Sequence, residues 1–221
     1  MKRAIIIGAT GLVGRKLVEL LLTSNDYKQV TLIVRKFQQQ YAGISKVQQI
    51  VLANFLMLKP EDVEGYSHAF SCLGTTLKQA KSKQCFYETD YGINMHFAQL
   101  LQQSSAHYLL ISAAGASVQS PFFYTRVKGE LERDVQALNL AKISFLRPSL
   151  LIGEHADTRL FEKLAQSAFL LTEKYLPKRY KHKPVTAMQV AQTLVAAAAT
   201  QVEACKIYDN LEIQYFSSNI L

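Results

Sequence analysis

Ser112, Tyr124 and Lys128 are the residues whose types and spacing first point to chemistry. Tyr124 and Lys128 form a Tyr-x-x-x-Lys pattern, and Ser112 lies 12 residues before the tyrosine. On a helix, residues four apart project from the same face, so the ammonium would lie beside the phenol. An ammonium about 4 Å away can lower the pKa of a phenol, ordinarily about 10, by as much as ~3 units. The pair therefore suits acid–base chemistry, although the same pattern standing alone is typical of an exposed helix face.

The elements that would position these residues are a strand, a turn and a helix. Residues 108–111 form an expected strand that delivers Ser112, and a small-residue turn follows. Ser120 and Pro121 predict the start of the helix that carries Tyr124. Serine caps free N–H groups, and proline at the first helical position loses no hydrogen bond.

A second candidate site lies near the N-terminus, where Gly8, Gly11 and Gly14 form a Gly-x-x-Gly-x-x-Gly pattern. The apolar run 4–7 before it is typical of a buried parallel strand, and apolar residues at helical spacing follow it. A strand joined to a helix through glycines exposes backbone N–H groups and the positive end of the helix dipole, which together bind a pyrophosphate. The alternative is a turn with incidental glycines. The N-terminal strand and a capping Thr10 favour dinucleotide binding.

Arg35 and Lys36 bear on the choice of cofactor. They end an expected strand, and Arg35 lies 21 residues after Gly14. In dinucleotide-binding folds an acidic residue near this position takes the ribose 2′-hydroxyl, whereas an arginine accommodates a 2′-phosphate. No carboxylate occurs between Arg35 and Glu61 to take the hydroxyl. The pattern therefore favours NADP over NAD, with two exposed cations of no special role as the alternative.

The alternation of strands and helices predicts an α/β fold, a doubly wound parallel sheet of the Rossmann type. We expect a single domain over 1–221, in which 154–183 forms a small substrate-side lobe with Arg159 as a candidate partner for an anionic substrate. Asn54 and Phe55 follow an expected strand where an adenine could rest, although Phe55 also suits the core. The expected strands are 4–7, 30–34, 47–52, 68–72, 108–111, 143–146 and 207–215, and the expected helices follow Gly14, cover 85–103 and begin at a capping box at Thr186.

Composition excludes several classes of protein. With 221 residues, 49% of them hydrophobic and 19% charged, the chain has the profile of an ordinary globular domain. No apolar run approaches the roughly 18 residues of a membrane span, and the start Met1-Lys2-Arg3 leads directly into a core strand, so we expect no signal peptide and a cytosolic location. The three cysteines lack Cys-x-x-Cys spacing, which favours reduced thiols.

The net charge of +8 is compatible with a nucleic acid, a membrane surface or an anionic small molecule as partner. Basic residues cluster at 78–83 and 178–183. Neither cluster has enough interleaved aromatic residues to form a stacking surface, so no nucleic-acid partner is expected. Solvated loops or the steering of a phosphorylated ligand account for both clusters. His68 and Cys72 share an expected strand and are not arranged as metal ligands, so no metal is expected. The oligomeric state is not indicated.

With these motifs the chain resembles the short-chain dehydrogenase/reductase superfamily, whose members pair a glycine-rich first turn with a serine, a tyrosine and a lysine in that order. It is most similar to the atypical, short members around the Tat-interacting-protein group of oxidoreductases. The closer match covers roughly residues 1–200. The stretches that carry it are GATGLVG at 8–14, VRK at 34–36, CLGTT at 72–76, VKGE at 127–130 and LRP at 146–148.

The resemblance implies a role for each of the three residues Ser112, Tyr124 and Lys128. Tyr124 would exchange a proton with the substrate's carbonyl oxygen, Ser112 would hydrogen-bond the same oxygen, and Lys128 would hold the nicotinamide ribose and lower the tyrosine pKa. Members often add a catalytic asparagine on the preceding helix, where this chain has Asn94. The cofactor-binding residues would be Gly8, Thr10, Gly11, Leu12, Val13, Gly14, Arg35, Lys36, Asn54, Leu73, Gly74, Thr75, Lys128 and Pro148.

These observations predict an NADP(H)-dependent oxidoreductase that acts on a carbonyl or hydroxyl group of an unidentified small molecule, with an anionic molecule as a candidate. Some atypical relatives use this fold to bind cofactor and partner proteins with little turnover. An NADP(H)-binding regulatory or interaction protein is therefore the alternative. The complete set of Ser112, Tyr124 and Lys128 favours the enzyme.

Overall fold

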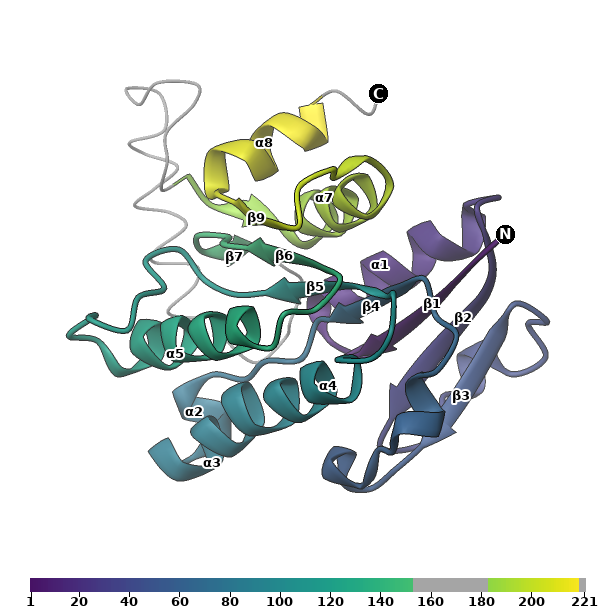
Figure 1. Cartoon of the computed structure of the whole chain (residues 1–221), viewed down its shortest axis with the longest axis horizontal. Coiled ribbons are helices and arrows are strands. Elements are labelled where there is room, and N and C mark those ends of the chain that lie inside the picture. Colours follow the sequence, from purple (N-terminus) through teal and green to yellow (C-terminus); the bar gives the residue numbers. More distant parts are fainter. Residues whose placement is uncertain (153–182, 219–221) are drawn as a thin grey trace.

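A parallel sheet forms the centre of the molecule (Figure 1), as seen in a computed structural model that describes residues 1–152 and 183–218. Within this part of the chain the sheet has seven strands in the order β3-β2-β1-β4-β5-β6-β9, all parallel. Two short strands, β7 and β8, pair with each other. The strands are β1 (Lys2–Ile7), β2 (Tyr27–Val34), β3 (Val47–Val51), β4 (His68–Ser71), β5 (His107–Ile111), β6 (Lys142–Leu146), β7 (Leu151–Ile152), β8 (Val185–Thr186) and β9 (Cys205–Tyr208).

Helices cover both faces of the sheet. In Figure 1, α1, α7 and α8 lie on one face, and α3, α4 and α5 lie on the other. Each face has its own apolar core, one that includes Leu17 and Val190 and one that includes Phe97 and Leu131. The helices are α1 (Leu12–Thr23), α2 (Leu77–Ala80), α3 (Lys83–Tyr87), α4 (Asn94–Leu100), α5 (Phe123–Ala137), α7 (Ala187–Thr200) and α8 (Asn210–Ser218).

The order of the strands determines where a ligand can lie. The chain runs outward from β1 through β2 to β3 and then returns to β4 on the other side of β1. Connections therefore leave in opposite directions from the carboxyl ends of β1 and β4, and such a switch point opens a crevice in doubly wound sheets. The predicted Rossmann-like α/β fold is confirmed.

Several element boundaries differ from the sequence predictions, among them those of two helices and of the last strand. First, the predicted helix start at Ser120 and Pro121 is wrong, because α5 begins at Phe123 without a side-chain cap. The Ser120 hydroxyl lies 2.6 Å from the Thr125 hydroxyl and accepts the Phe122 N–H, so it shapes the turn before the helix.

Two further differences concern a helix and the last strand. The helix predicted over 85–103 ends at Leu100 and contains a π-helical segment, Glu88–Ile93. The strand predicted over 207–215 ends at Tyr208. There the Asp209 carboxylate accepts the N–H groups of Leu211 and Glu212 and so favours the turn into α8. The capping box predicted at Thr186 is confirmed.

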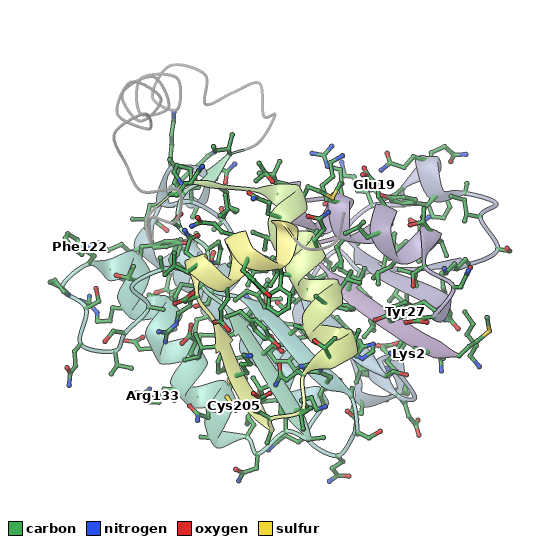
Figure 2. The ribbon with its side chains drawn as sticks, turned by 90° about the horizontal axis from the view of Figure 1, so that it is seen from above. Lys2, Glu19, Tyr27, Phe122, Arg133 and Cys205 are labelled. Atoms are coloured by element: carbon green, nitrogen blue, oxygen red, sulfur yellow. The ribbon has the colours of Figure 1, made fainter. Side chains whose placement is uncertain are left out.

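Buried polar side chains connect the strands near their amino ends. The Tyr27 hydroxyl lies 2.8 Å from His68 Nδ1, and His107 Nε2 lies 2.7 Å from the Ser144 hydroxyl. Figure 2 shows Tyr27 beside Lys2, its pairing partner on β1, at this end of the sheet. Burial lowers the pKa of His68 to about 4 and that of His107 to about 3, so both rings are neutral at pH 7. These histidines belong to the scaffold.

One predicted feature lies outside the part of the chain that the structure describes. The predicted lobe at 154–183, including Arg159, lies outside the described residues except for Lys183. Among the residues that are described, no helix is long and apolar enough to cross a membrane. No group of three or more potential metal ligands occurs among them either.

Candidate functional site

The glycine turn after β1 is closed so tightly that it excludes side chains. Gly8 has φ +76°, and a Cβ there would lie 2.5 Å from the backbone of Cys72 and Leu73. A Cβ on Gly14 would collide with the Gly8 carbonyl oxygen. Glycine at both positions therefore lets α1 begin directly against the ends of β1 and β4.

The start of α1 leaves its first N–H groups available for a ligand. The helix begins at Leu12, its N-cap is Gly11, and no side chain caps it. The prediction that Thr10 caps this helix is wrong, because the cap falls one residue later on a glycine. Uncapped N–H groups at the positive end of a helix can bind an anion, and the pyrophosphate predicted here from the sequence stays a prediction.

A cavity of about 460 Å³ extends from this turn to the end of β2. Thr10 of the turn lines it, and so do Arg35 and Lys36, whose side chains are exposed. Asn54 is not among the residues that line the cavity. Its Oδ1 accepts the Leu56 N–H. The full lining consists of Gly8, Thr10, Ile33, Val34, Arg35, Lys36, Gln38, Phe55 and Leu73. The cavity thus extends from the glycine turn to the two cations Arg35 and Lys36.

The loop after β4 continues from the cavity to Lys128. Leu73 lines the cavity, and a Cβ on Gly74 would lie 3.8 Å from Lys128 Nζ. Lys128 is 3% exposed, and its ammonium lies 2.7 Å from Asp90 Oδ1 in a buried ion pair. Burial alone would lower the pKa of Lys128, but the charges of Asp90 and Tyr124 act in the opposite direction, and the pKa is raised overall. Lys128 is therefore a buried cation at neutral pH.

Ser112 lies at the end of β5 with an unused hydroxyl. Its backbone N–H donates to the Leu146 carbonyl oxygen at 2.7 Å, and its side chain is buried. Its Oγ has no hydrogen-bond partner among the described residues. Because a buried polar atom is normally paired, this hydroxyl has the property expected of a group that bonds to a ligand.

Tyr124 lies in the first turn of α5, next to the loop that leaves Ser112. That loop is held against the helix by a bond from the Ser117 N–H to the Thr125 carbonyl, and a Cβ on Gly129 would collide with Ser117. The Tyr124 ring packs 5.6 Å from Phe86 and keeps 37% of its surface exposed. The structure thus presents an accessible phenol one helical turn from a buried ammonium.

Pro148 and Arg147 close this side of the site. The Pro148 carbonyl accepts the Ala114 N–H at 2.8 Å and so fastens the loop after Ser112. Arg147 forms an ion pair with the buried Glu132 of α5, which raises the pKa of the guanidinium. The resemblance implies that Pro148 binds the cofactor, and it includes Arg147 only as part of a motif.

Sequence reasoning missed Asp90. This carboxylate is fully buried and pairs with Lys128, although it lies 38 positions away in the chain. The available signal was the helical spacing of Asp90 and Asn94 between the apolar Phe86 and Phe97, which places both polar residues on the face that covers the sheet. The Asn94 side chain is itself buried and bonds to protein groups, donating to the Asp90 carbonyl at 2.9 Å.

Comparisons with known sequences agree on one family. The HIM1 family profile matches residues 22–183. The FMP52-1 protein of Scheffersomyces stipitis, named as mitochondrial, is 32% identical over 206 residues that make up 90% of this chain and 89% of that protein. The HTATIP2 protein of Rattus norvegicus is 32% identical over 173 residues, 76% of this chain and 70% of that one.

Solved structures share the fold at low sequence identity. UDP-glucuronic acid 4-epimerase from Bacillus cereus in complex with NAD superimposes with a TM-score of 0.68 at 13% identity, over 94% of this chain and 78% of that one. Vestitone reductase from alfalfa gives a TM-score of 0.63 at 14% identity, over 93% and 76%. At such identities the likeness concerns the fold.

Proposed function

Because the chain belongs to the HIM1 family, with the FMP52 and HTATIP2 proteins, and has the NAD(P)-binding Rossmann fold of atypical short-chain dehydrogenases/reductases, we propose that it is an NADP(H)-dependent oxidoreductase. Its substrate would be a small molecule with a carbonyl or hydroxyl group. The observation that carries this proposal is the buried Ser112 hydroxyl, which has no hydrogen-bond partner among the described residues and precedes the loop that bonds to α5, the helix of Tyr124 and Lys128.

The residues present fit a dinucleotide. The cradle that a Cβ at Gly8 or Gly14 would fill suits the pyrophosphate, against the uncapped start of α1. The cavity beside Thr10 suits the adenosine half, and Lys128, reached through Leu73 and Gly74, suits the nicotinamide ribose. When bound, NADPH would supply the hydride for reduction of a carbonyl.

The chain's own residues would then handle the substrate oxygen. Ser112 would donate a hydrogen bond to it, which supports the negative charge that develops there during reduction. Tyr124 would give its phenolic proton to the same atom, and Lys128 would stabilise the phenolate that remains. In the oxidation direction the proton would pass back to Tyr124.

The first test removes only the Ser112 hydroxyl. We expect Ser112→Ala to lower turnover about 10²-fold, since one hydrogen-bond donor to the developing oxyanion is lost. Stability should stay the same or rise slightly, because the deleted atom makes no bond in the protein. Both proteins would be screened for NADPH oxidation with a panel of aldehydes and ketones, and their thermal unfolding compared. Undiminished turnover in the variant would contradict the mechanism.

Preference for NADP is part of the proposal, supported by Arg35 and Lys36 at the cavity. We expect Arg35→Ala to weaken NADPH binding about tenfold and NADH binding hardly at all, because only NADPH carries the 2′-phosphate. Titration calorimetry measures both. Arg133→Ala is the matched control, since Arg133 is an exposed arginine of α5 that pairs with Asp134 and is not among the residues that line the cavity. An unchanged ratio of the two affinities in Arg35→Ala would refute the assignment.

The alternative is an NADP(H)-binding regulatory or interaction protein with little turnover. It predicts NADPH binding in the wild type and no oxidation with any compound of the panel. A cytosolic location also stays a prediction, and it stands beside the mitochondrial names of the fungal relatives.

A further inference from the structure

The Asp90 carboxylate joins two elements of the candidate site. Its Oδ1 lies 2.7 Å from Lys128 Nζ on α5, and its Oδ2 accepts the Thr75 N–H at 2.8 Å in the loop after β4. A Cβ on Gly74 would lie only 3.3 Å from Oδ1, so the glycine lets this loop run against the ion pair. Asp90 therefore contacts both the lysine and the loop that leads to the cavity.

Hydrogen bonds also hold the backbone around Asp90 in place. Asp90 belongs to the π-helical segment Glu88–Ile93, a helix type that occurs often at functional sites. Asn94 is fully buried, donates to the Asp90 carbonyl and accepts the Ser71 hydroxyl at the end of β4. The segment is thus fastened to the sheet beside the carboxylate.

Stability alone does not explain a buried ion pair at this place. Removing two charges from water costs several kcal/mol per ion, and apolar side chains of similar volume often stabilise a core as well or better. What the pair provides is an ammonium held at one point, between the accessible Tyr124 and the loop of Gly74. The other charged group near Lys128 is Glu132 of α5, which pairs with Arg147. Asp90 is therefore the carboxylate that determines where Lys128 lies.

We propose that Asp90 is a positioning residue, which holds the Lys128 ammonium where it meets the nicotinamide ribose and Tyr124. The role of Asp90 in cofactor binding rests on the NAD(P)-binding fold. Its role in catalysis rests on the proposed function. Asp90 acts through Lys128 and does not itself touch the substrate oxygen.

A double-mutant cycle on NADPH binding tests this proposal without any need for turnover. We expect Asp90→Asn to weaken NADPH binding about tenfold, and Lys128→Met to weaken it by a similar factor. The asparagine keeps the acceptor for the Thr75 N–H and removes only the charge. Once Lys128 is methionine, Asp90→Asn should have no further effect, so the double variant and Lys128→Met should have equal Kd values by calorimetry.

Additive effects in the cycle would overturn the proposal, because they would mean that Asp90 supports the loop or the fold independently of Lys128. If Asp90→Asn alone does not fold, Lys128→Met and the double variant still supply the decisive comparison. The buried Asp90 of Lys128→Met can become neutral by taking up a proton, and the double variant leaves no unpaired buried charge. Asp26→Asn is the matched control, because Asp26 is an exposed aspartate that pairs with Lys2 at the amino end of the sheet. It should leave NADPH binding unchanged.

The pH dependence of turnover supplies a second readout that a purely structural role would not affect. Removing the Asp90 charge takes away the main effect that opposes burial and keeps the pKa of Lys128 raised, so Lys128 loses its proton at a lower pH. The pH at which reduction declines should therefore fall by about one to two units in Asp90→Asn. An unchanged profile in a folded Asp90→Asn would contradict positioning. Absence of turnover in the wild type would refute the proposed function instead, and the binding cycle would still decide the role of Asp90.

Discussion

Replacing Tyr124 by phenylalanine should lower kcat by a factor of about 10² to 10⁴, the usual contribution of a general acid or base. Only the phenolic oxygen is lost. The ring keeps its packing against Phe86, and its exposed position means that no buried partner is left unsatisfied. NADPH affinity and thermal stability should therefore change little. Steady-state kinetics on any substrate found in the screen, with calorimetry for NADPH, would measure the separation of kcat from binding.

Tyr87→Phe is a matched control for this substitution, because it removes a hydroxyl from a tyrosine of α3 that stacks on Tyr91. Its kcat should equal that of the wild type. Full activity of Tyr124→Phe would refute the role of the phenol in proton transfer. If neither wild type nor variant turns over any compound, while both bind NADPH, the regulatory or interaction role becomes the better description.

Acid should destabilise the protein well before its carboxylates are protonated. His68 and His107 are neutral in the folded protein because burial lowers their pKa values to about 4 and about 3. Both pKa values return to about 6.5 on unfolding, so the unfolded chain binds up to two more protons at pH 5. The stabilisation is complete above pH 6.5 and is lost as the pH falls toward 4. We expect the free energy of unfolding to drop by about 5 kcal/mol between pH 7.5 and pH 4.5.

Urea denaturation at several pH values measures this loss. His107→Gln should reduce the slope of the free energy against pH by about half over this range, whatever its effect on stability at neutral pH. His96→Gln is the control, because His96 lies half-buried on α4 and does not belong to the buried chain of polar side chains. An unchanged slope in His107→Gln would mean that other groups cause the acid sensitivity.

Local patterns in the sequence were sufficient for the fold. An apolar run, a glycine turn and an amphipathic helix recur along the chain, and parallel strands covered on both faces require such runs. The glycines at Gly8 and Gly14 were predictable because a turn this tight leaves no room for a Cβ. The exact start of α5 was not, because the Ser120 side chain bonds within the turn before the helix, where the pattern suggested a cap.

The sequence by itself thus determined the contents of one edge of a parallel sheet. These are the glycine turn after β1, the two cations after β2, and a serine, a tyrosine and a lysine. Strand ends converge there in every doubly wound fold. Only the tertiary structure decided what surrounds Lys128. Asp90, the Thr75 N–H and Gly74 come from separate elements, and no spacing in the chain reports that they pack around one ammonium. Burial in the tertiary structure also decided the charges of these groups. Removal from water makes the charges of Asp90 and Lys128 depend on each other and keeps His68 and His107 neutral.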